Sequence, residues 1–342
     1  MAINISRFYG RERIVLDCEV LTPMFLGGAD QNAQLRAAPF KGLLRYWWRI
    51  ANGCQFNETT ELYEEESKLF GSPDEKQGKS RVTIQVEPGK ELQTSKDPFR
   101  NPGNVKHPEV GKNGTVNPLG YLAGMGLIKN ASVQYRYFVP GGRFRIFIVA
   151  KLEDITPAVI LFEKFAAAGS RSRNGWGSLA VDGISQSEAK AGNFLQSTIK
   201  PFAETLAVDY PHCLGADKKG LLLWKTRNAA GSWEDCMRNL AEIYIQTRLA
   251  LNIKGNDRQD RHLLGYPVTH HSVSKWQRHA SGLRLFIRKP ATGSYRGYIL
   301  HVPHLFSKKM WDKPAIEQER LWKNVHAKLD ALAERALLEE LS

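Results

Sequence analysis

A chain of 342 residues is long enough for one large domain or two smaller ones, and we take two as the starting expectation. Hydrophobic residues make up 42% and aromatic residues 10%, which excludes a solvated, disordered chain because such chains are poor in both. The sequence holds 48 Lys and Arg against 35 Asp and Glu, so its formal charge of +13 favours a polyanionic partner over an acidic small molecule. A basic protein that is merely soluble remains the alternative.

The sequence indicates neither secretion nor membrane insertion. The N-terminal stretch MAINISRFYGRER lacks the apolar core of a signal peptide, and no uninterrupted apolar run approaches membrane-spanning length. We therefore expect a cytoplasmic protein without a membrane partner.

Cysteines and histidines give little sign of a metal or another cofactor. The four cysteines contain no CxxC pair, so they predict ordinary thiols rather than a zinc ribbon or a disulfide framework. They are Cys18, Cys54, Cys213 and Cys236. Two histidine pairs invite a metal interpretation, His270 with His271 and His301 with His304 of HVPH. HVPH follows an expected strand without helical i,i+4 spacing, so we expect no bound metal or cofactor.

The first part of the chain predicts the order strand, loop, helix, strand. Residues 14–21 alternate as in a half-buried strand, and the inward positions are Ile14, Leu16, Cys18 and Val20. A loop with two glycines follows, and PFKGLLRYWWRIAN then predicts a helix with Pro39 at its first position. After the acidic, helical-looking stretch ELYEEESKLFG, the segment RVTIQVE alternates again as a second strand.

Residues 89–130 break the pattern, because they are rich in glycine and proline with little periodicity. We expect a long insertion there. The segment VQYRYFVPGGRFRIFIVAK then predicts a hairpin of two strands around Pro140, Gly141 and Gly142.

A further helix is expected after this hairpin, with Thr156 as N-cap, Pro157 in its first turn and Gly169 as the glycine that stops it. SLAVDG at 178–183 can return as a strand. The first half therefore has the split-βαβ, ferredoxin-like order of elements.

The second half runs through a similar order, with strands expected at GLLLWK, LRLFIR and YILHVP. A helix is expected through Met237 and Tyr244, between the first two of these strands. The last helix carries an apolar stripe, which we assign to the core rather than to a partner-docking face. The stripe consists of Trp322, Val325, Leu329, Leu332 and Ala336. We expect an α+β protein with two ferredoxin-like (RRM-like) domains, 1–195 and 196–342.

One candidate site is the helix after Pro39. Lys41, Arg45 and Arg49 recur at four-residue steps, so the sequence predicts one cationic face with no acidic residue to neutralise it. Arg36 adds a cation and Trp48 a stacking surface, a combination used to bind single-stranded nucleic acid. A solvated basic face is the alternative.

The second candidate site is GSRSRNGWGSL, residues 169–179. Glycines at 169, 175 and 177 allow positive φ and close backbone approach, and exposed amides there could line a concavity for phosphate. Arg171 and Arg173 would add forked, charge-assisted contacts. The candidate residues of this loop are Gly169, Arg171, Arg173, Asn174, Gly175, Trp176 and Gly177. An ordinary turn is the alternative here. A third basic stretch, 254–289, predicts either a nucleic-acid surface or a plain solvated one.

Catalytic signals are few. The sequence has no GxxxxGKS, no HExxH and no nucleophile elbow. Asp30 in the GGAD loop could hold a hydrated metal, although a lone loop aspartate is more often a turn or capping residue.

TPMFLGGADQNAQLRAAPFKGLLRYWWRIANG, the LFG of 69–71 and AAAGSRSRNGWGSL together resemble the RAMP superfamily of CRISPR proteins. Within it they are most similar to the family of subunit one of the type III-B Cmr effector complex. The resemblance implies two ferredoxin-like domains, RNA as the ligand and a place among other Cmr subunits in a guide-RNA-dependent antiviral complex. It further implies a non-catalytic RNA-binding cap, distal to the 5′ tag of the guide, that contacts guide CRISPR RNA, target RNA or both.

The resemblance also carries over residues. Its KGxxR helix falls on Lys41, Gly42, Arg45 and Arg49, and the preceding loop supplies Gly27 and Gly28. The family's GxGxxxxxGxG spacing falls on Ala167, Gly169, Gly175 and Gly177, so the first glycine is replaced. Asp30 matches the loop aspartate of the cleaving backbone subunit, which makes it the low-ranked catalytic candidate.

Two other functions stay open on sequence. One is a metal-dependent endoribonuclease or guide-RNA processing enzyme that uses Asp30 or a histidine such as His212. The other is a structural end-cap whose basic surfaces meet acidic partner subunits.

Overall fold

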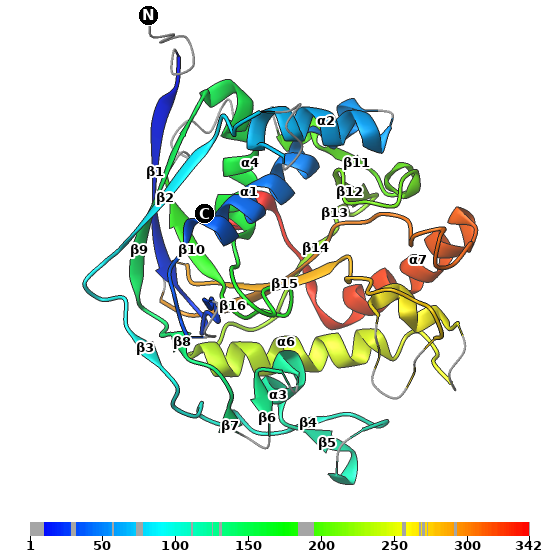
Figure 1. Cartoon of the computed structure of the whole chain (residues 1–342). Coiled ribbons are helices and arrows are strands. Elements are labelled where there is room, and N and C mark those ends of the chain that lie inside the picture. Colours follow the sequence, from blue (N-terminus) through cyan, green and yellow to red (C-terminus); the bar gives the residue numbers. More distant parts are fainter. Residues whose placement is uncertain are drawn as a thin grey trace, which may run out of the picture.

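The computed structural model describes residues 10–341, apart from 29–31, 57, 73–77, 111, 125, 130–131, 184–194, 255–257, 267, 269–270, 272 and 291–292. Within these residues, two four-stranded antiparallel sheets carry most of the fold (Figure 1). None of the described helices is long and apolar enough to cross a membrane.

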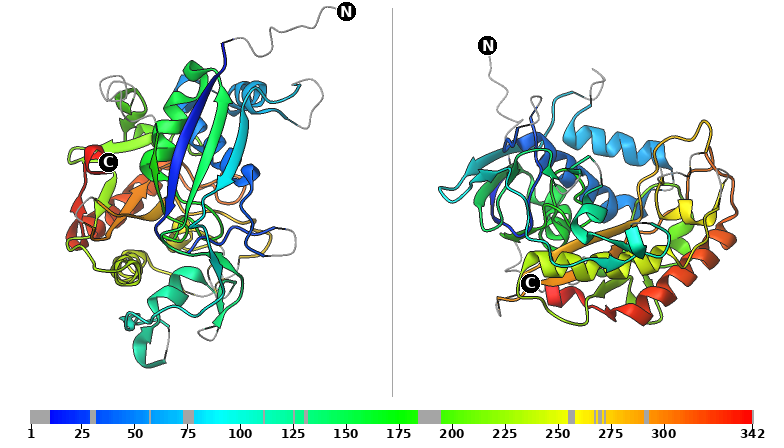
Figure 2. Two further views of the ribbon diagram at one scale, coloured as in Figure 1. Left: turned by 90° about the vertical axis from the view of Figure 1, so that its left-hand side faces the viewer. Right: turned by 90° about the horizontal axis from the view of Figure 1, so that it is seen from below.

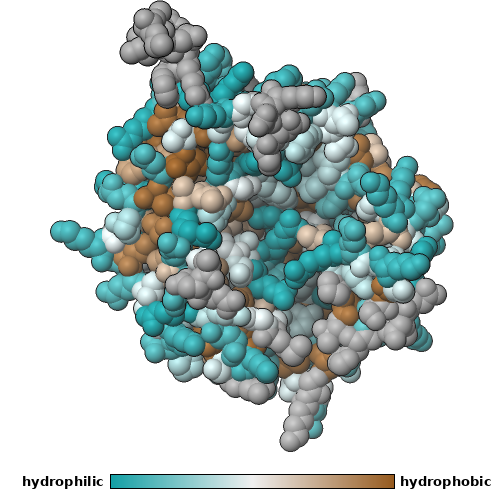
Figure 3. Space-filling view, viewed as in Figure 1, coloured by the Kyte–Doolittle hydropathy of each residue, from teal (hydrophilic) through white to brown (hydrophobic). Residues whose placement is uncertain are grey.

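The first sheet has the strand order β10-β1-β9-β2. Its strands are β1 (Glu12–Val20), β2 (Thr83–Pro88), β9 (Arg143–Ala150) and β10 (Leu179–Asp182). Helices α1 (Ala37–Asn52) and α4 (Leu152–Phe165) pack on one face, while the other face lies open in Figure 2. The inward positions of β1 are buried as its alternation predicts. On the surface, apolar residues gather at the left of Figure 3, where the first sheet runs in Figure 1.

The second sheet has the strand order β15-β16-β14-β17. Its strands are β14 (Leu223–Lys225), β15 (Leu283–Arg288), β16 (Arg296–His301) and β17 (Glu334–Arg335). Helices α6 (Trp233–Arg248) and α7 (Ala315–Leu332) pack on one face of it. Both halves follow the chain order βαββαβ, and in both the strands lie in the order fourth, first, third, second.

The two halves form alternating layers, because the second sheet is buried on both faces. Leu285 and Ile299 pack with α6 and α7. Phe286 and Tyr298, on the opposite face, belong to the same apolar cluster as α1 and α4, and the Phe286 ring lies 5.7 Å from that of Phe165. The order is therefore first sheet, α1 and α4, second sheet, α6 and α7. The domain limits 1–195 and 196–342 remain a prediction.

Shorter elements fill the connections. Helix α2 (Thr59–Phe70) follows α1 across a 3₁₀ turn at Gly53–Gln55. The three-stranded sheet of the second half consists of β11 (Ile199–Pro201), β12 (Leu214–Asp217) and β13 (Gly220–Leu221). Further 3₁₀ turns span Glu204–Leu206, Asp260–Leu264 and Leu338–Leu341.

The insertion at 89–130 is folded where it is described, and it packs on the second half. It holds β3 (Thr94–Ser95), β4 (Val105–Lys106), a 3₁₀ turn (Lys112–Gly114), β5 (Thr115–Val116), α3 (Pro118–Ala123) and β6 (Ile128–Lys129). Arg100 donates to Ser232 Oγ at 2.6 Å and to Asp235 at 2.7 Å, at the start of α6. Glu109 pairs with Arg261 at 2.5 Å, so ion pairs fasten the insertion at two points.

The expected hairpin at 133–151 is wrong. Strand β7 (Ser132–Val133) pairs with β6, β8 (Tyr137–Phe138) pairs with β3, and β9 pairs with β1 and β2. The turn instead joins β1, since Gly141 N donates to Val20 O at 2.7 Å and Val20 N to Gly142 O at 2.9 Å. The turn residues therefore pass the chain from one sheet to another.

Three helix boundaries also differ from the expectation. Helix α1 begins at Ala37, and α4 begins at Leu152 with Glu153 and Asp154 in its first turn, where carboxylates favour a helix start. Thr156 is thus no N-cap, and Pro157 lies inside the helix. Helix α4 ends at Phe165, so Gly169 does not stop it.

Candidate functional site

The glycine-rich loop lies where the two halves meet. Leu285 N donates to Arg173 O at 2.8 Å, and Ile287 N donates to Ser178 Oγ at 3.0 Å. Asn174 also forms a parallel bridge with Leu285. The loop therefore runs along the edge strand β15 and satisfies backbone donors of the second sheet.

The glycines of this loop are required by the protein's own packing. All three have positive φ: 92° at Gly169, 89° at Gly175 and 63° at Gly177. An added Cβ would lie 2.5 Å from Phe25 O at Gly169 and 2.6 Å from Met237 Sδ at Gly175. The close approach that the sequence predicts is present, but the groups that approach at these positions are backbone and side chains of this chain.

Trp176 is fully buried, which corrects its expected role as an RNA contact. Its ring lies 5.5 Å from Phe25, 5.3 Å from Phe99 and 6.0 Å from Trp233. This aromatic cluster joins the loop, the insertion and α6, so the tryptophan anchors the loop and offers no ring for stacking on a base.

The arginines of the loop have no carboxylate partner among the described residues. Arg171 is exposed and has φ 59°, and burial of its stem together with nearby Arg278 lowers its pKa. Arg173 is half-buried, donates to Ser281 O at 3.2 Å and lies 5.7 Å from the ring of Tyr46 on α1. Asn174 donates to Leu122 O at 3.0 Å. The loop thus holds positive charge that these carbonyl and ring contacts do not neutralise.

Arg284 of β15 adds a second guanidinium beside Arg173. Its side chain is 4% exposed and lies 4.8 Å from the ring of Tyr46 and 5.1 Å from that of Trp47. Burial lowers the pKa of Arg284, and the charge of Arg173 lowers it further. Two cations thus face one tyrosine ring, an arrangement that a bound anion would stabilise.

Two histidines complete this group. The rings of His279 and His304 lie 5.8 Å apart. Burial, aided by Arg173, lowers the pKa of His279 to about 3 and that of His304 to about 4, so both are neutral at pH 7. We call Tyr46, Arg173, His279, Arg284 and His304 the junction cluster, because they come from both halves.

The basic face of α1 is partly neutralised, which corrects the expectation that no acidic residue faces it. Glu66 of α2, 1% exposed in its side chain, pairs with Arg45 at 2.5 Å and with Arg49 through two hydrogen bonds. The hydrogen bond to Glu66 raises the pKa of Arg49. One carboxylate against two guanidiniums leaves one net charge, and the three side chains hold α2 on α1.

Trp48 also differs from the expectation that it offers a stacking surface, because it is only 7% exposed. Its ring lies 6.4 Å from Phe56 and 6.2 Å from Phe70, and its indole N–H donates to Asp154 O at 3.1 Å. It packs α1 against α2 and α4 and offers no stacking surface.

The start of α1 is the more open part of this candidate site. Lys41 is half-buried, and burial with neighbouring Arg45 lowers its pKa. Arg36 is exposed and donates to Gly27 O at 2.6 Å, while Gly28 N donates to Asn32 O at 2.9 Å. Gly42 is exposed, and a Cβ there would meet no atom within 4 Å.

The catalytic candidates gain no supporting contact. Asp30 lies outside the described residues. His212 is 8% exposed, burial lowers its pKa, and its Nδ1 lies 3.0 Å from Tyr210 O. Among the described residues, no three His, Cys, Asp or Glu side chains group in a way that could hold a metal ion.

Sequence reasoning misses most of the junction cluster. It suggests His304 only as a metal ligand, and His279 and Arg284 only as part of a basic stretch. One signal is present at Arg284, because it is one of only two charged residues, with Arg288, in the apolar strand LRLFIR. Tyr46 gives no signal, since a tyrosine in an amphipathic helix is ordinary.

A family described as the RAMP superfamily matches residues 17–180, which contain α1, most of the first sheet and the glycine-rich loop. Residues of this chain are 39% identical over 75 residues to CRISPR system Cmr subunit Cmr1-2 of Pyrococcus furiosus. They are 28% identical over 156 residues to Cmr subunit Cmr1-1 of the same organism. Residues 17–180 of this chain therefore resemble the RAMP superfamily, and parts of the chain are similar to Cmr1 proteins.

The matches to these two curated relatives cover 21% and 43% of this chain, and they span only 38% and 40% of the relatives themselves. The apo crystal structure of Cmr1 from Pyrococcus furiosus is similar with a TM-score of 0.53 and 15% identity, over 93% of this chain and 97% of that one. A chain of the type III-B Cmr-beta complex, bound to cognate target RNA and AMPPnP in the presence of ssDNA, gives 0.50 and 14%, over 93% and 98%. At such identities the likeness concerns the fold alone.

Proposed function

We propose that this protein is a non-catalytic RNA-binding subunit of a type III-B CRISPR (Cmr) ribonucleoprotein effector. The names of its curated relatives and its charge of +13 support this assignment. Its partners would be other Cmr subunits with guide CRISPR RNA, target RNA or both. Within the effector it would cap the end distal to the 5′ tag of the guide.

The junction cluster is the observation that supports RNA binding most directly. Arg173 is half-exposed, and its side chain contacts a carbonyl oxygen and an aromatic ring. Its planar guanidinium can therefore turn a free edge to a phosphate oxygen, while Arg284 behind it adds positive potential from a buried position. Exposed Arg171 and Arg278 extend the charge along the surface. These arginines would bind phosphates along one RNA strand whatever its base sequence, and base pairing between the RNAs would supply the sequence specificity.

The proposal includes a division of the fold into two units. We infer two ferredoxin-like units, 1–195 and 196–342, and the repeated βαββαβ order with one common strand order supports them. RRM domains of this topology bind RNA on the open sheet face through exposed aromatic side chains.

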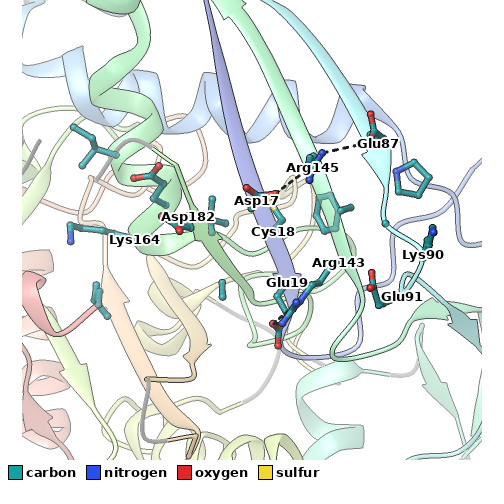
Figure 4. A pocket seen from close by; sticks show the side chains of 18 of the residues that line it. Asp17, Cys18, Glu19, Glu87, Lys90, Glu91, Arg143, Arg145, Lys164 and Asp182 are labelled. Atoms are coloured by element: carbon teal, nitrogen blue, oxygen red, sulfur yellow. Dashed lines mark hydrogen bonds and ion pairs between the residues drawn. The ribbon is translucent and has the colours of Figure 1, made fainter. Parts of the chain in front are cut away.

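The open face of the first sheet does not fit that RRM mode. Phe147 is buried beneath Arg13, whose guanidinium lies 4.2 Å from the ring. Arg145 pairs with Asp17 at 3.1 Å and with Glu87 at 4.0 Å, as Figure 4 shows. The adjoining hollow of about 1420 Å³ is lined by seven carboxylates and four basic side chains. A phosphate backbone would be repelled there, which favours the junction cluster.

The test is photo-crosslinking of the whole chain to single-stranded RNA that carries 4-thiouridine, followed by peptide mapping. We expect adducts on the peptides that contain Tyr46, Arg173 and His279. Adducts confined to strands β1 and β9 would contradict the proposed site. Co-purification with Cmr subunits but without nucleic-acid absorbance would favour the structural end-cap.

A further inference from the structure

Two of the four cysteines meet at the contact between the end of α1 and the second half. Cys54 lies in the 3₁₀ turn Gly53–Gln55, and Cys213 immediately precedes β12. The two segments touch through their backbones, since a Cβ added to Gly53 would lie 2.6 Å from His212 O. The thiol of Cys54 lies 3.7 Å from the same carbonyl oxygen.

The two cysteines lie on either side of this backbone contact, because the sulfur of Cys54 approaches the carbonyl group of the residue before Cys213. Each thiol also changes the pKa of the other, as expected of neighbouring groups. A disulfide needs a sulfur–sulfur distance of about 2.05 Å, and rotation about the two Cα–Cβ bonds sets where the sulfurs lie across the contact.

The surroundings give the two thiols different chemistry. Cys54 is half-buried, and its interaction with Cys213 and the nearby charge of Lys200 lower its pKa, against an opposing effect of burial and Glu204. Cys213 is fully buried, and its interaction with Cys54 together with burial raises its pKa. Cys54 is therefore the accessible thiol that ionises first, and Cys213 is the thiol held beside it.

The other two cysteines lack this arrangement. Cys18 and Cys236 are 3% and 1% exposed, and burial raises the pKa of each. Both keep their protons at neutral pH and are shielded from solvent oxidants.

We propose that Cys54 and Cys213 are a reversible oxidation site that reacts with hydroperoxides, such as hydrogen peroxide, to form a disulfide between the two halves. The Cys54 thiolate attacks one peroxide oxygen, so an S–O bond forms, the O–O bond breaks, and the departing hydroxide takes up a proton to become water. Cys213 then loses its proton and attacks the sulfur of the Cys54 sulfenic acid; the S–S bond forms, and the S–O bond breaks to release a second water. Two thiols are oxidised by two electrons, and one peroxide is reduced to two waters.

The disulfide would pin the end of α1 to the β11–β12–β13 sheet. It closes a long loop, because the cysteines stand far apart in the sequence, and constraint of the unfolded chain then raises thermal stability. This oxidation does not depend on RNA binding.

The test uses the full chain with stoichiometric hydrogen peroxide. Free thiols are then blocked with N-ethylmaleimide, and the digest is mapped by mass spectrometry without reduction. We expect one cross-linked peptide pair, Cys54 with Cys213, that disappears with dithiothreitol, and a midpoint of thermal unfolding several degrees higher in the oxidised chain. Cys54→Ser should abolish both effects, whereas the matched control Cys18→Ala should keep the cross-link.

Three results would overturn the proposal. They are oxidation of Cys54 only to sulfenic or sulfinic acid with Cys213 still alkylated after unfolding, a disulfide between two chains, and preferential oxidation of Cys18 or Cys236. The mapping is done on the unsubstituted chain, so it decides the matter even if a variant fails to fold.

Discussion

Substitution of Arg173 by alanine removes the most accessible charge of the junction cluster. A charge-assisted hydrogen bond contributes about 1.5–3 kcal/mol, and Arg173 is half-exposed, so the lower end of that range applies. We therefore expect affinity for single-stranded RNA to fall about tenfold at low salt. The slope of log affinity against log salt should become shallower by about 0.7, because the variant neutralises one phosphate fewer.

The assay is fluorescence anisotropy of a labelled oligonucleotide at several salt concentrations. Arg145→Ala is the control, because it removes one arginine charge, more exposed than that of Arg173, from the open sheet face, where Asp17 and Glu87 surround it. Arg173→Lys should recover part of the affinity, since lysine keeps the charge and loses the fork. The unfolding midpoint of each variant separates weaker RNA binding from a damaged fold, because Arg173 also holds Ser281 O.

An unchanged salt slope for Arg173→Ala, with an RNA affinity within twofold of the original chain, would contradict a phosphate contact at Arg173. An equal loss of RNA affinity in Arg145→Ala would also contradict it, because net charge alone would then explain the binding.

Four further results are expected. Glu66→Gln should lower the free energy of unfolding, measured in urea, by about 1–3 kcal/mol, because two guanidiniums of α1 lose their carboxylate partner. RNA binding should not weaken, and unchanged stability would contradict the assigned ion pairs. Trp176→Ala should lower that free energy by about 3–5 kcal/mol, and a folded variant with normal stability but no RNA affinity would favour Trp176 as an RNA contact. The urea midpoint should fall as the pH drops from about 6.5 towards 4, because the unfolded chain binds protons that the partly buried His279 (pKa about 3) and His304 (pKa about 4) do not bind in the folded chain. A flat profile would contradict the lowered pKa values of these histidines. Labelled RNA incubated with the purified chain and Mg²⁺ or Mn²⁺ should stay intact at concentrations that bind it, whereas metal-dependent cleavage would support the endoribonuclease alternative.

Local patterns were enough to locate several elements. Alternation identified β1 and β2, β15 and β16 lie in the segments expected as strands, and the apolar stripe of α7 is buried at Trp322, Val325 and Leu329 as expected. These predictions were correct because the spacing of apolar residues along a strand or helix determines which face they share. The prediction of a hairpin was wrong because β8 and β9 pair with strands far away in the sequence and not with each other.

The candidate site shows the same limit. The sequence located the glycine-rich loop and its arginines, because glycine and arginine have distinctive conformational and charge properties. It could not show that Glu66 approaches Arg45 and Arg49 or that Trp176 fills a core, since both depend on which helices pack together.

The sequence by itself determined the charge of the molecule, the faces of its main strands and helices, and the two glycine-bearing segments that resemble the RAMP superfamily. Only the tertiary structure decided which arginines are neutralised and which remain available, because charge pairing acts over a few ångströms between residues that the chain brings together from both halves. Arg45 and Arg173 are alike in the sequence, yet one faces a buried carboxylate and the other an aromatic ring beside a second guanidinium.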